Sequence, residues 1–95
     1  MKYTTLQELF AEESRWTQGE FARDEIGRWG NPSDPKAVSF CLLGGLELVY
    51  GLNTEAFKNA WRKLRAACGK EPSGINDSKG TTIADIQRVV REAGV

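Results

Sequence analysis

The amino-acid sequence predicts an α+β domain in which about four helices surround a buried central helix at 35–50, with a small β-hairpin at about 20–30. Three observations lead to this fold class. Several segments place apolar residues at helical spacing behind threonine caps, glycines interrupt that spacing between 19 and 30, and the longest apolar run lies in the middle of the chain. With 95 residues, 40% of them hydrophobic and 27% charged, residues 1–95 fit one folded domain.

The first helix is predicted over 5–14. Thr5 and Glu8 have the spacing of a capping box, in which each residue bonds the other's main chain at a helix start. Three apolar side chains then fall on one helical face: Leu6, Leu9 and Phe10. We therefore expect this helix to pack its apolar face against the hydrophobic core.

A tight hairpin is predicted next, because the segments at 21–23 and 28–29 flank the four-residue turn "DEIG", which ends in Gly27. The segment "NPSDPK" then combines turn residues with a helix start, since Asp34 is a good N-cap and Pro35 fits the first helical position. From there the central helix is apolar on almost every side. Its Gly44–Gly45 pair indicates that another helix, the hairpin or a bound ligand approaches closely.

The following helix begins after Thr54 and carries an apolar stripe from Phe57 to Cys68. Its outer side carries a basic face, which we define as Lys58, Arg62 and Arg65 with the nearby Lys63 and Lys70. Between 55 and 70 there are five basic residues and one acidic residue. Such a face is either an ordinary solvated surface or a site for an anionic partner.

The segment at 69–80, "GKEPSGINDSKG", shows no strand pattern and is expected to be a long loop. The last helix opens at Thr82 with Asp85 and closes at Gly94.

Composition and motifs exclude several functions. The net charge is zero, so nucleic acid is an unexpected partner, and the apolar run is too short to cross a membrane. The N-terminus lacks the pattern of a secretion signal, which makes the cytoplasm the expected location. There is no histidine, and Cys41 and Cys68 are expected to be buried, reduced and inert. We therefore expect no catalytic residues, no metal and no cofactor, and an enzyme ranks third among the function classes, because no base and nucleophile can be named together.

What remains is a chemistry of recognition, since flat apolar rings and planar donors can stack on bases or hold phosphate and carboxylate groups. The candidate binding residues are Trp16, Gln18, Arg23, Asp24, Arg28, Trp29, Asn76 and Asp77. A structural interpretation stays open beside this one. In it, the two tryptophans close the core, and Arg23 pairs with Asp24 or with Glu12 or Glu13.

Several motifs in order along the chain resemble a family of small bacterial and phage proteins catalogued as a domain of unknown function. They are "WTQG", "ARD" followed by Gly27, "SDPKAVSFCLLGG", "IND" and "GTTIAD", spread from Trp16 to Ala93. The resemblance implies a common fold and assigns no activity, substrate or catalytic residue.

Two hypotheses for the function follow. The first is a non-enzymatic binding module for a small anionic ligand, nucleotide-like or phosphorylated, held between the hairpin and the "IND" segment; a phage-type sequestering protein is one form of it. The alternative is a protein-binding inhibitor or regulator of a bacterial defence or regulatory protein, which acts through Lys58, Arg62 and Arg65. Homo-oligomerisation is compatible with both.

Overall fold

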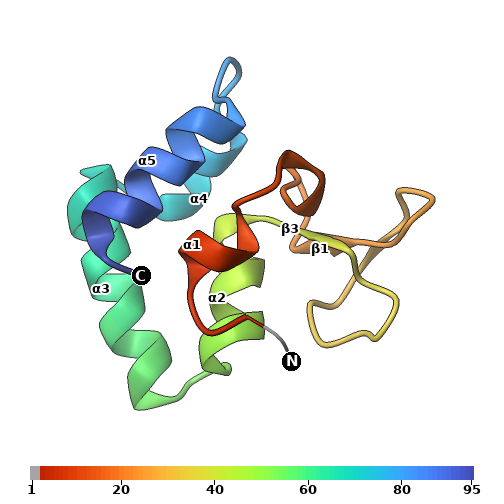
Figure 1. Ribbon diagram of the computed structural model, residues 1–95, viewed down its shortest axis with the longest axis horizontal. Helices are drawn as coiled ribbons and strands as arrows, with labels where there is room; N and C mark the ends of the chain where they lie inside the picture. The colour runs from red at the N-terminus through yellow and green to blue at the C-terminus, as the bar shows by residue number, and fades with distance from the viewer. Residues whose placement is uncertain (1–2) are drawn as a thin grey trace.

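A computed structural model describes residues 3–95, and within them the chain forms an α+β fold with five α-helices, one 3-10 turn and three short strands (Figure 1). In chain order the elements are α1 (Leu6–Leu9), η1 (Glu13–Arg15), β1 (Ala22–Arg23), β2 (Trp29–Gly30), β3 (Ser39–Phe40), α2 (Leu42–Tyr50), α3 (Glu55–Cys68), α4 (Pro72–Asp77) and α5 (Ile83–Ala93). This confirms the predicted fold class.

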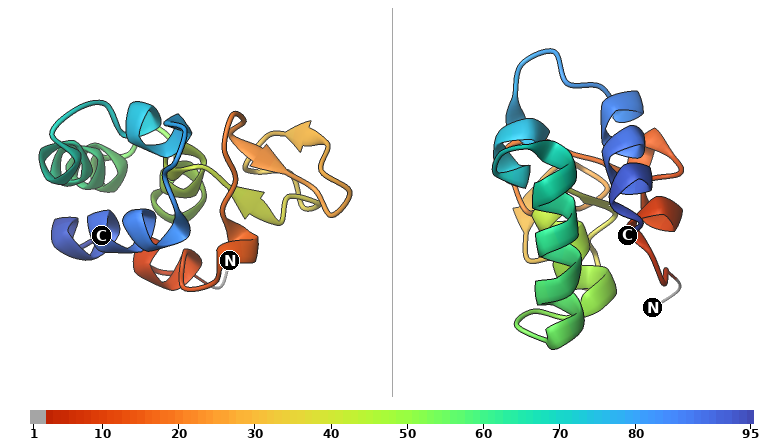
Figure 2. Two further views of the ribbon diagram at one scale, coloured as in Figure 1. Left: turned by 90° about the horizontal axis from the view of Figure 1, so that it is seen from above. Right: turned by 90° about the vertical axis from the view of Figure 1, so that its left-hand side faces the viewer.

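The helices form one side of the molecule and the sheet projects from the other (Figures 1 and 2). Helix α2 lies between these parts, and α3 and α5 lie side by side at the far end from the sheet. The core is apolar and draws on most elements: Leu6, Leu9, Phe10, Ala22, Phe40, Leu42, Leu46, Ala60, Leu64, Ile86, Val89, Val90 and Val95. Burial of these side chains is the main stabilising term of the helical part.

The two longest helices, α3 and α5, form where the sequence predicts them. The hydroxyl of Thr54 accepts a hydrogen bond from the Phe57 N–H, and Thr82 and Asp85 form the predicted capping box. Each helix ends at a glycine in the left-handed region, Gly69 with φ +73° and Gly94 with φ +72°. These caps satisfy main-chain groups that a helix end leaves without partners.

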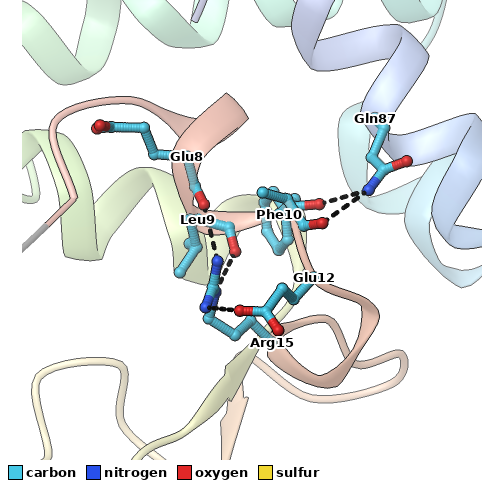
Figure 3. A network of polar contacts seen from close by, with 7 residues as sticks. Glu8, Leu9, Phe10, Glu12, Arg15 and Gln87 are labelled. Atoms are coloured by element: carbon cyan, nitrogen blue, oxygen red, sulfur yellow. Dashed lines mark hydrogen bonds and ion pairs between the residues drawn. The ribbon is translucent and has the colours of Figure 1, made fainter.

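The predicted helix at 5–14 is shorter in the structure. It ends at Leu9, and the chain then passes through η1. Figure 3 shows how the end of α1 is satisfied: the Arg15 guanidinium donates to the Leu9 and Glu8 carbonyls at 2.6 and 3.0 Å, and Gln87 of α5 donates to the Phe10 carbonyl at 2.9 Å. Arg15 and Gln87 therefore supply the hydrogen bonds that the carbonyls at the end of α1 would otherwise receive from further helical turns.

The prediction of one central helix over 35–50 is wrong in its first half. Asp34 caps only a turn, with its carboxylate accepting from the Lys36 N–H at 2.9 Å, and Ser39–Phe40 is strand β3. Helix α2 begins after Cys41. A continuous apolar run looks the same in a buried strand and in a buried helix, so periodicity could not separate the two.

The expected loop at 69–80 contains a further helix, α4. Pro72 occupies a first-turn position, where its missing N–H costs nothing. The helix is only six residues long and includes Gly74, so its local signal is weak. Its formation places Asn76 in the interior of the protein.

The sheet is antiparallel, with the strand order β2-β1-β3. Ala22 pairs with Gly30 on one side and with Phe40 on the other. The predicted hairpin is confirmed: the Asp24 N–H donates to the Arg28 carbonyl at 2.9 Å, and Gly27 takes a φ of +86° in the turn. The third strand, β3, is the part that the sequence did not predict.

The close approach predicted at Gly44–Gly45 is also confirmed, and the neighbour at Gly44 is the start of the hairpin. A Cβ on Gly44 would lie 2.0 Å from the Phe21 carbonyl oxygen, which is inside any permitted contact. A Cβ on Gly45 would lie 3.0 Å from side-chain atoms of Leu9 and Phe10. Helix α2 therefore packs its glycine face against main chain on one side and α1 on the other.

Candidate functional site

Four of the predicted binding residues lie together in a network of hydrogen bonds centred on Asn76, which we call the Asn76 network. The Asn76 amide oxygen accepts from the Trp16 indole N–H at 2.8 Å, and its amide nitrogen donates to an Asp77 carboxylate oxygen at 2.8 Å. Gln18 donates to the Asn76 carbonyl at 2.8 Å. The sequence analysis placed these four among eight candidate ligand-binding residues, and in the structure they are hydrogen-bond partners of one another.

Asn76 itself is 0% exposed and has partners for both ends of its amide. Besides Trp16, its oxygen accepts from the Leu42 N–H at 3.1 Å, at the first residue of α2. Its nitrogen also donates to the Thr17 carbonyl at 3.1 Å. A buried amide without partners would destabilise the fold, whereas this one has all its partners. Its hydrogen bonds join the 16–18 segment, α2 and α4.

Arg23 is likewise engaged within the protein. Its three guanidinium nitrogens donate to the Thr17 hydroxyl at 2.9 Å, the Gly27 carbonyl at 3.0 Å and the Gln18 carbonyl at 3.2 Å. Among the described residues no ion pair includes it, so the interpretation that paired it with Asp24, Glu12 or Glu13 is wrong about the partners. The guanidinium is instead a connector of main-chain segments around the hairpin.

Asp24 and Arg28 stabilise the hairpin turn. One Asp24 carboxylate oxygen accepts from the Arg28 N–H at 2.9 Å and the Ile26 N–H at 3.1 Å, and the other pairs with the Arg28 guanidinium at 3.0 Å. These contacts, led by the main-chain bond from Arg28, hold the pKa of Asp24 below its usual range. The carboxylate is thereby fixed in its ionised form as a turn residue.

Trp29 lies apart from the other predicted residues and is 74% exposed, so it does not close the core. It shares the outer part of the hairpin with apolar side chains that the sequence analysis did not single out. We define the hairpin surface as the outer part of the hairpin together with the 35–38 segment: Ile26, Pro35 and Val38 lie around one depression with Glu25 and Lys36, Trp29 lines a separate one, and the Asp24–Arg28 pair borders both. A depression of about 440 Å³ is hollowed into it. The sequence did carry one indication of this surface, because an isoleucine in the otherwise polar turn "DEIG" is expected to be exposed.

A second depression, of about 260 Å³, lies where the first hypothesis placed a ligand, between the start of the hairpin and α4. Its lining is Gly19, Glu20, Phe21, Cys41, Leu43, Ser73 and Asp77. The ionisable carboxyls here are Glu20 and Asp77, and no lysine or arginine is among the lining residues. A negatively charged ligand would therefore meet like charge in this depression.

The thiols have the environment of structural cysteines. Cys41 is buried and caps α2, with its sulfur accepting from the Gly44 N–H at 3.2 Å, and burial raises the pKa of this thiol. Burial also raises the pKa of Cys68. Within residues 3–95, no cluster of histidine, cysteine or carboxylate side chains has the arrangement of a metal site, and no helix is long and apolar enough to cross a membrane.

Lys58, Arg62 and Arg65 of the basic face lie on the side of α3 opposite the buried Ala60 and Leu64, and Lys63 and Lys70 are exposed nearby. Arg65 pairs with Glu71 at 3.3 Å, and Arg62 bonds the Asn59 side chain. No ion pair within residues 3–95 includes Lys58, Lys63 or Lys70. The face is thus a patch of positive charge at the end of the molecule far from the hairpin (Figure 1).

The fold defines a class of protein: a small, mainly helical α+β domain whose interior polar residues hold its segments together, with exposed apolar side chains on the hairpin and basic side chains on α3. The chain belongs to the Family of unknown function (DUF6197), whose sequence profile matches residues 4–94. This match confirms the resemblance noted from the motifs. No curated protein and no solved structure gives a significant match to the chain.

Proposed function

We propose that this protein is a non-enzymatic binding module that uses the basic face of α3 to hold an acidic surface of another bacterial protein, in an inhibitory or regulatory role. The observation that carries the proposal is the separation of charge along the chain. Residues 55–70 contain five basic residues and one acidic residue, which leaves eight basic and twelve acidic residues for the rest. Although the whole chain has no net charge, α3 and the residues just after it carry a strong excess of positive charge.

The position of the charges supports association with a folded partner. Lys58, Arg62 and Arg65 follow one another at spacings of four and three, so they share one side of α3. Their helix is anchored from behind by Ala60 and Leu64, which are buried in the core. Positive groups on a rigid support steer an acidic partner during encounter and fix its orientation.

A protein partner fits these charges better than a nucleic acid does. Duplex DNA is a long polyanion, and the excess of acidic residues outside α3 would repel the parts of it that extend past the basic face. A patch of carboxylates on a folded protein can match the basic face in size, so it need not extend over the acidic parts of the surface. Binding to DNA is thus an outcome that the test below has to separate.

The hypothesis of a small anionic ligand stays a prediction, with less support. Arg23, which it needs as the anion-binding group, already donates from all three of its nitrogens, and the depression beside α4 is lined by carboxyls. These bonds use three of the five guanidinium N–H groups, so a ligand would meet a side chain whose position and role are already accounted for by the protein itself.

The test compares Lys58→Glu/Arg62→Glu with a control of equal charge change outside the basic face, Lys79→Glu/Arg91→Glu. The wild-type protein is immobilised to recover a partner from bacterial lysate, and association of the purified partner is then timed at several salt concentrations. We expect the face variant to slow association roughly tenfold at low salt and to flatten its salt dependence, because steering is lost. The control should keep wild-type kinetics.

Three results would contradict the proposal: equal kinetics for the face variant and wild type, equal losses in the face variant and the control, or tighter binding to a DNA duplex than to the recovered protein. A thermal-shift screen with nucleotides and sugar phosphates runs beside this test. A saturating ligand at 100 times its dissociation constant would stabilise the fold by about 2.7 kcal/mol and return weight to the first hypothesis.

A further inference from the structure

Most of the large apolar side chains that are exposed within residues 3–95 lie in the sheet region. Of the five large hydrophobic side chains that are exposed within residues 3–95, Phe21, Ile26, Trp29 and Val38 belong to the sheet region, and the fifth is Leu52. Ile26 and Trp29 are 73% and 74% exposed. Apolar side chains gathered in this way, with a tryptophan among them, are typical of protein–protein contacts.

The edge of the sheet at this surface is open. On the far edge, β3 is covered, because the Thr17 N–H donates to the Phe40 carbonyl at 3.0 Å and Trp16 bridges to Phe40. On the near edge, β2 pairs with β1 alone within the described chain. Sheet edges with unpaired main-chain groups are templates for a further strand.

The hydrogen-bond pattern of the hairpin shows which residue of β2 offers those groups. The Asp24 N–H donates to the Arg28 carbonyl, so Arg28 turns its main chain toward β1. In an antiparallel ladder the pairs alternate, which makes Arg23 and Trp29 a pair without bonds between them. The N–H and C=O of Trp29 therefore point outward, along the open edge.

The positive and negative charges of the hairpin surface are equal in number, so two copies of this surface can associate without net electrostatic repulsion. Asp24 and Arg28 neutralise each other, and Glu25 and Lys36 contribute one charge of each sign. The basic face of α3, by contrast, would repel its own copy. Of the two exposed patches, only the hairpin surface is compatible with itself in charge.

We propose that two copies of this chain associate through β2, antiparallel to each other and centred on Trp29, to give one continuous six-stranded sheet. The outward main-chain groups of Trp29 bond those of the partner's Trp29, and the two indole rings lie directly opposite on one side of the sheet. Each ring thereby covers apolar surface that is exposed in the single chain. The interface is isologous, as in most homodimers.

Sedimentation equilibrium from about 1 μM to about 1 mM tests the proposal. The wild-type protein should move from 10.6 kDa toward twice that mass as concentration rises. Trp29→Lys should weaken self-association at least tenfold, since the ring is the central contact. Leu52→Lys, a matched change at a side chain that is 57% exposed and far from the sheet in sequence, should associate as the wild type does.

Hydrogen exchange of the 28–31 segment provides a readout of the edge itself, and its protection should increase with concentration in the wild type and in Leu52→Lys but not in Trp29→Lys. A wild-type protein that stays at 10.6 kDa throughout overturns the proposal and leaves the hairpin surface for a different protein. Equal association of Trp29→Lys also overturns it and assigns the dimer to another surface. Lys58→Glu/Arg62→Glu should dimerise normally, which separates this test from that of the proposed function.

Discussion

The helical part and the sheet part of this protein are stabilised in different ways. Helices α2, α3 and α5 contribute long apolar side chains to a common core, where burial supplies most of the stability. The strands are only two residues long, and polar side chains hold them through bonds to the main chain. Arg23 and Asp24 make such bonds around the hairpin, and Asn76 bonds the neighbouring segments at Thr17 and Leu42.

This difference shows why the segment at 15–30 resembles a binding site. Planar donors and carboxylates that could hold a ligand are equally suited to hold carbonyls and N–H groups of the chain itself. Sheets this short cannot rely on their own ladder, so side chains take over the task. The polar residues of the sheet region accordingly bind the protein to itself, and neither proposed contact, through the basic face or through Trp29, depends on Asn76 or Arg23 as a ligand-binding group.

The largest effect is expected where the two parts touch. In Gly44→Ala the new Cβ would lie 2.0 Å from the Phe21 carbonyl oxygen, so β1 or α2 must move. We expect a loss of about 3 kcal/mol or more in the free energy of unfolding, measured by urea denaturation. Gly74→Ala in α4 is the matched control, since its Cβ meets nothing within 4 Å. It should be neutral or stabilise by up to about 1 kcal/mol.

If Gly44→Ala were as stable as the control, the close packing of the hairpin on α2 would be refuted. A variant that does not fold at all can be replaced by Gly45→Ala. Its contacts at 3.0 Å are with the flexible side chains of Leu9 and Phe10, and a smaller loss is expected.

A smaller effect is expected when the Asn76 network is broken without a change in size. Asn76→Asp removes the donor to the Thr17 carbonyl and brings a second carboxylate beside Asp77 in a fully buried position. We expect a loss of about 2–3 kcal/mol in unfolding free energy at pH 7. Asp77→Asn keeps an oxygen that can accept from the Gly19 N–H and should cost less than about 1 kcal/mol. Equal losses in the two variants would refute the central role of Asn76.

The third prediction sharpens the comparison at Arg23. Arg23→Ala removes three bonds around the hairpin and should lower the unfolding free energy by about 1–2 kcal/mol. Arg28→Ala, on the same hairpin, removes an exposed ion pair and should cost less than about 0.5 kcal/mol. An Arg23→Ala protein with unchanged stability that has lost affinity for a nucleotide would instead favour the small-ligand hypothesis.

The sequence predicted the helices whose apolar stripes and caps agree. Both α3 and α5 have a threonine at the start, a glycine at the end and one apolar face, so local and tertiary preferences coincide. Strand β3 could not be predicted, because Ser39–Phe40 lies in an apolar run whose partner, β1, is selected only in three dimensions. Helix α4 is too short to give a periodic signal.

The candidate site was predictable in membership and less so in role. The chemistry of their side chains placed Trp16, Gln18, Asn76 and Asp77 in one candidate set, together with four residues that lie outside the Asn76 network. The partners of Arg23 left no trace in the sequence, because two of them are main-chain carbonyls, which every residue has. The exposure of Trp29 likewise depends on the hairpin projecting from the helical part.

Cys41 lies at the junction between the sheet region and the helical part, so chemical labelling of its thiol can report on that junction. Its sulfur lies at the start of α2, bonded to the Gly44 N–H, and the Cys41 N–H donates to the Phe21 carbonyl at 3.2 Å. Cys41 is only 7% exposed at the depression beside α4, so a thiol reagent reacts with it slowly in the closed protein and faster when hairpin and helix separate. In a Cys68→Ser background, the labelling rate of this one sulfur therefore measures how often the sheet region detaches while the helical part remains folded.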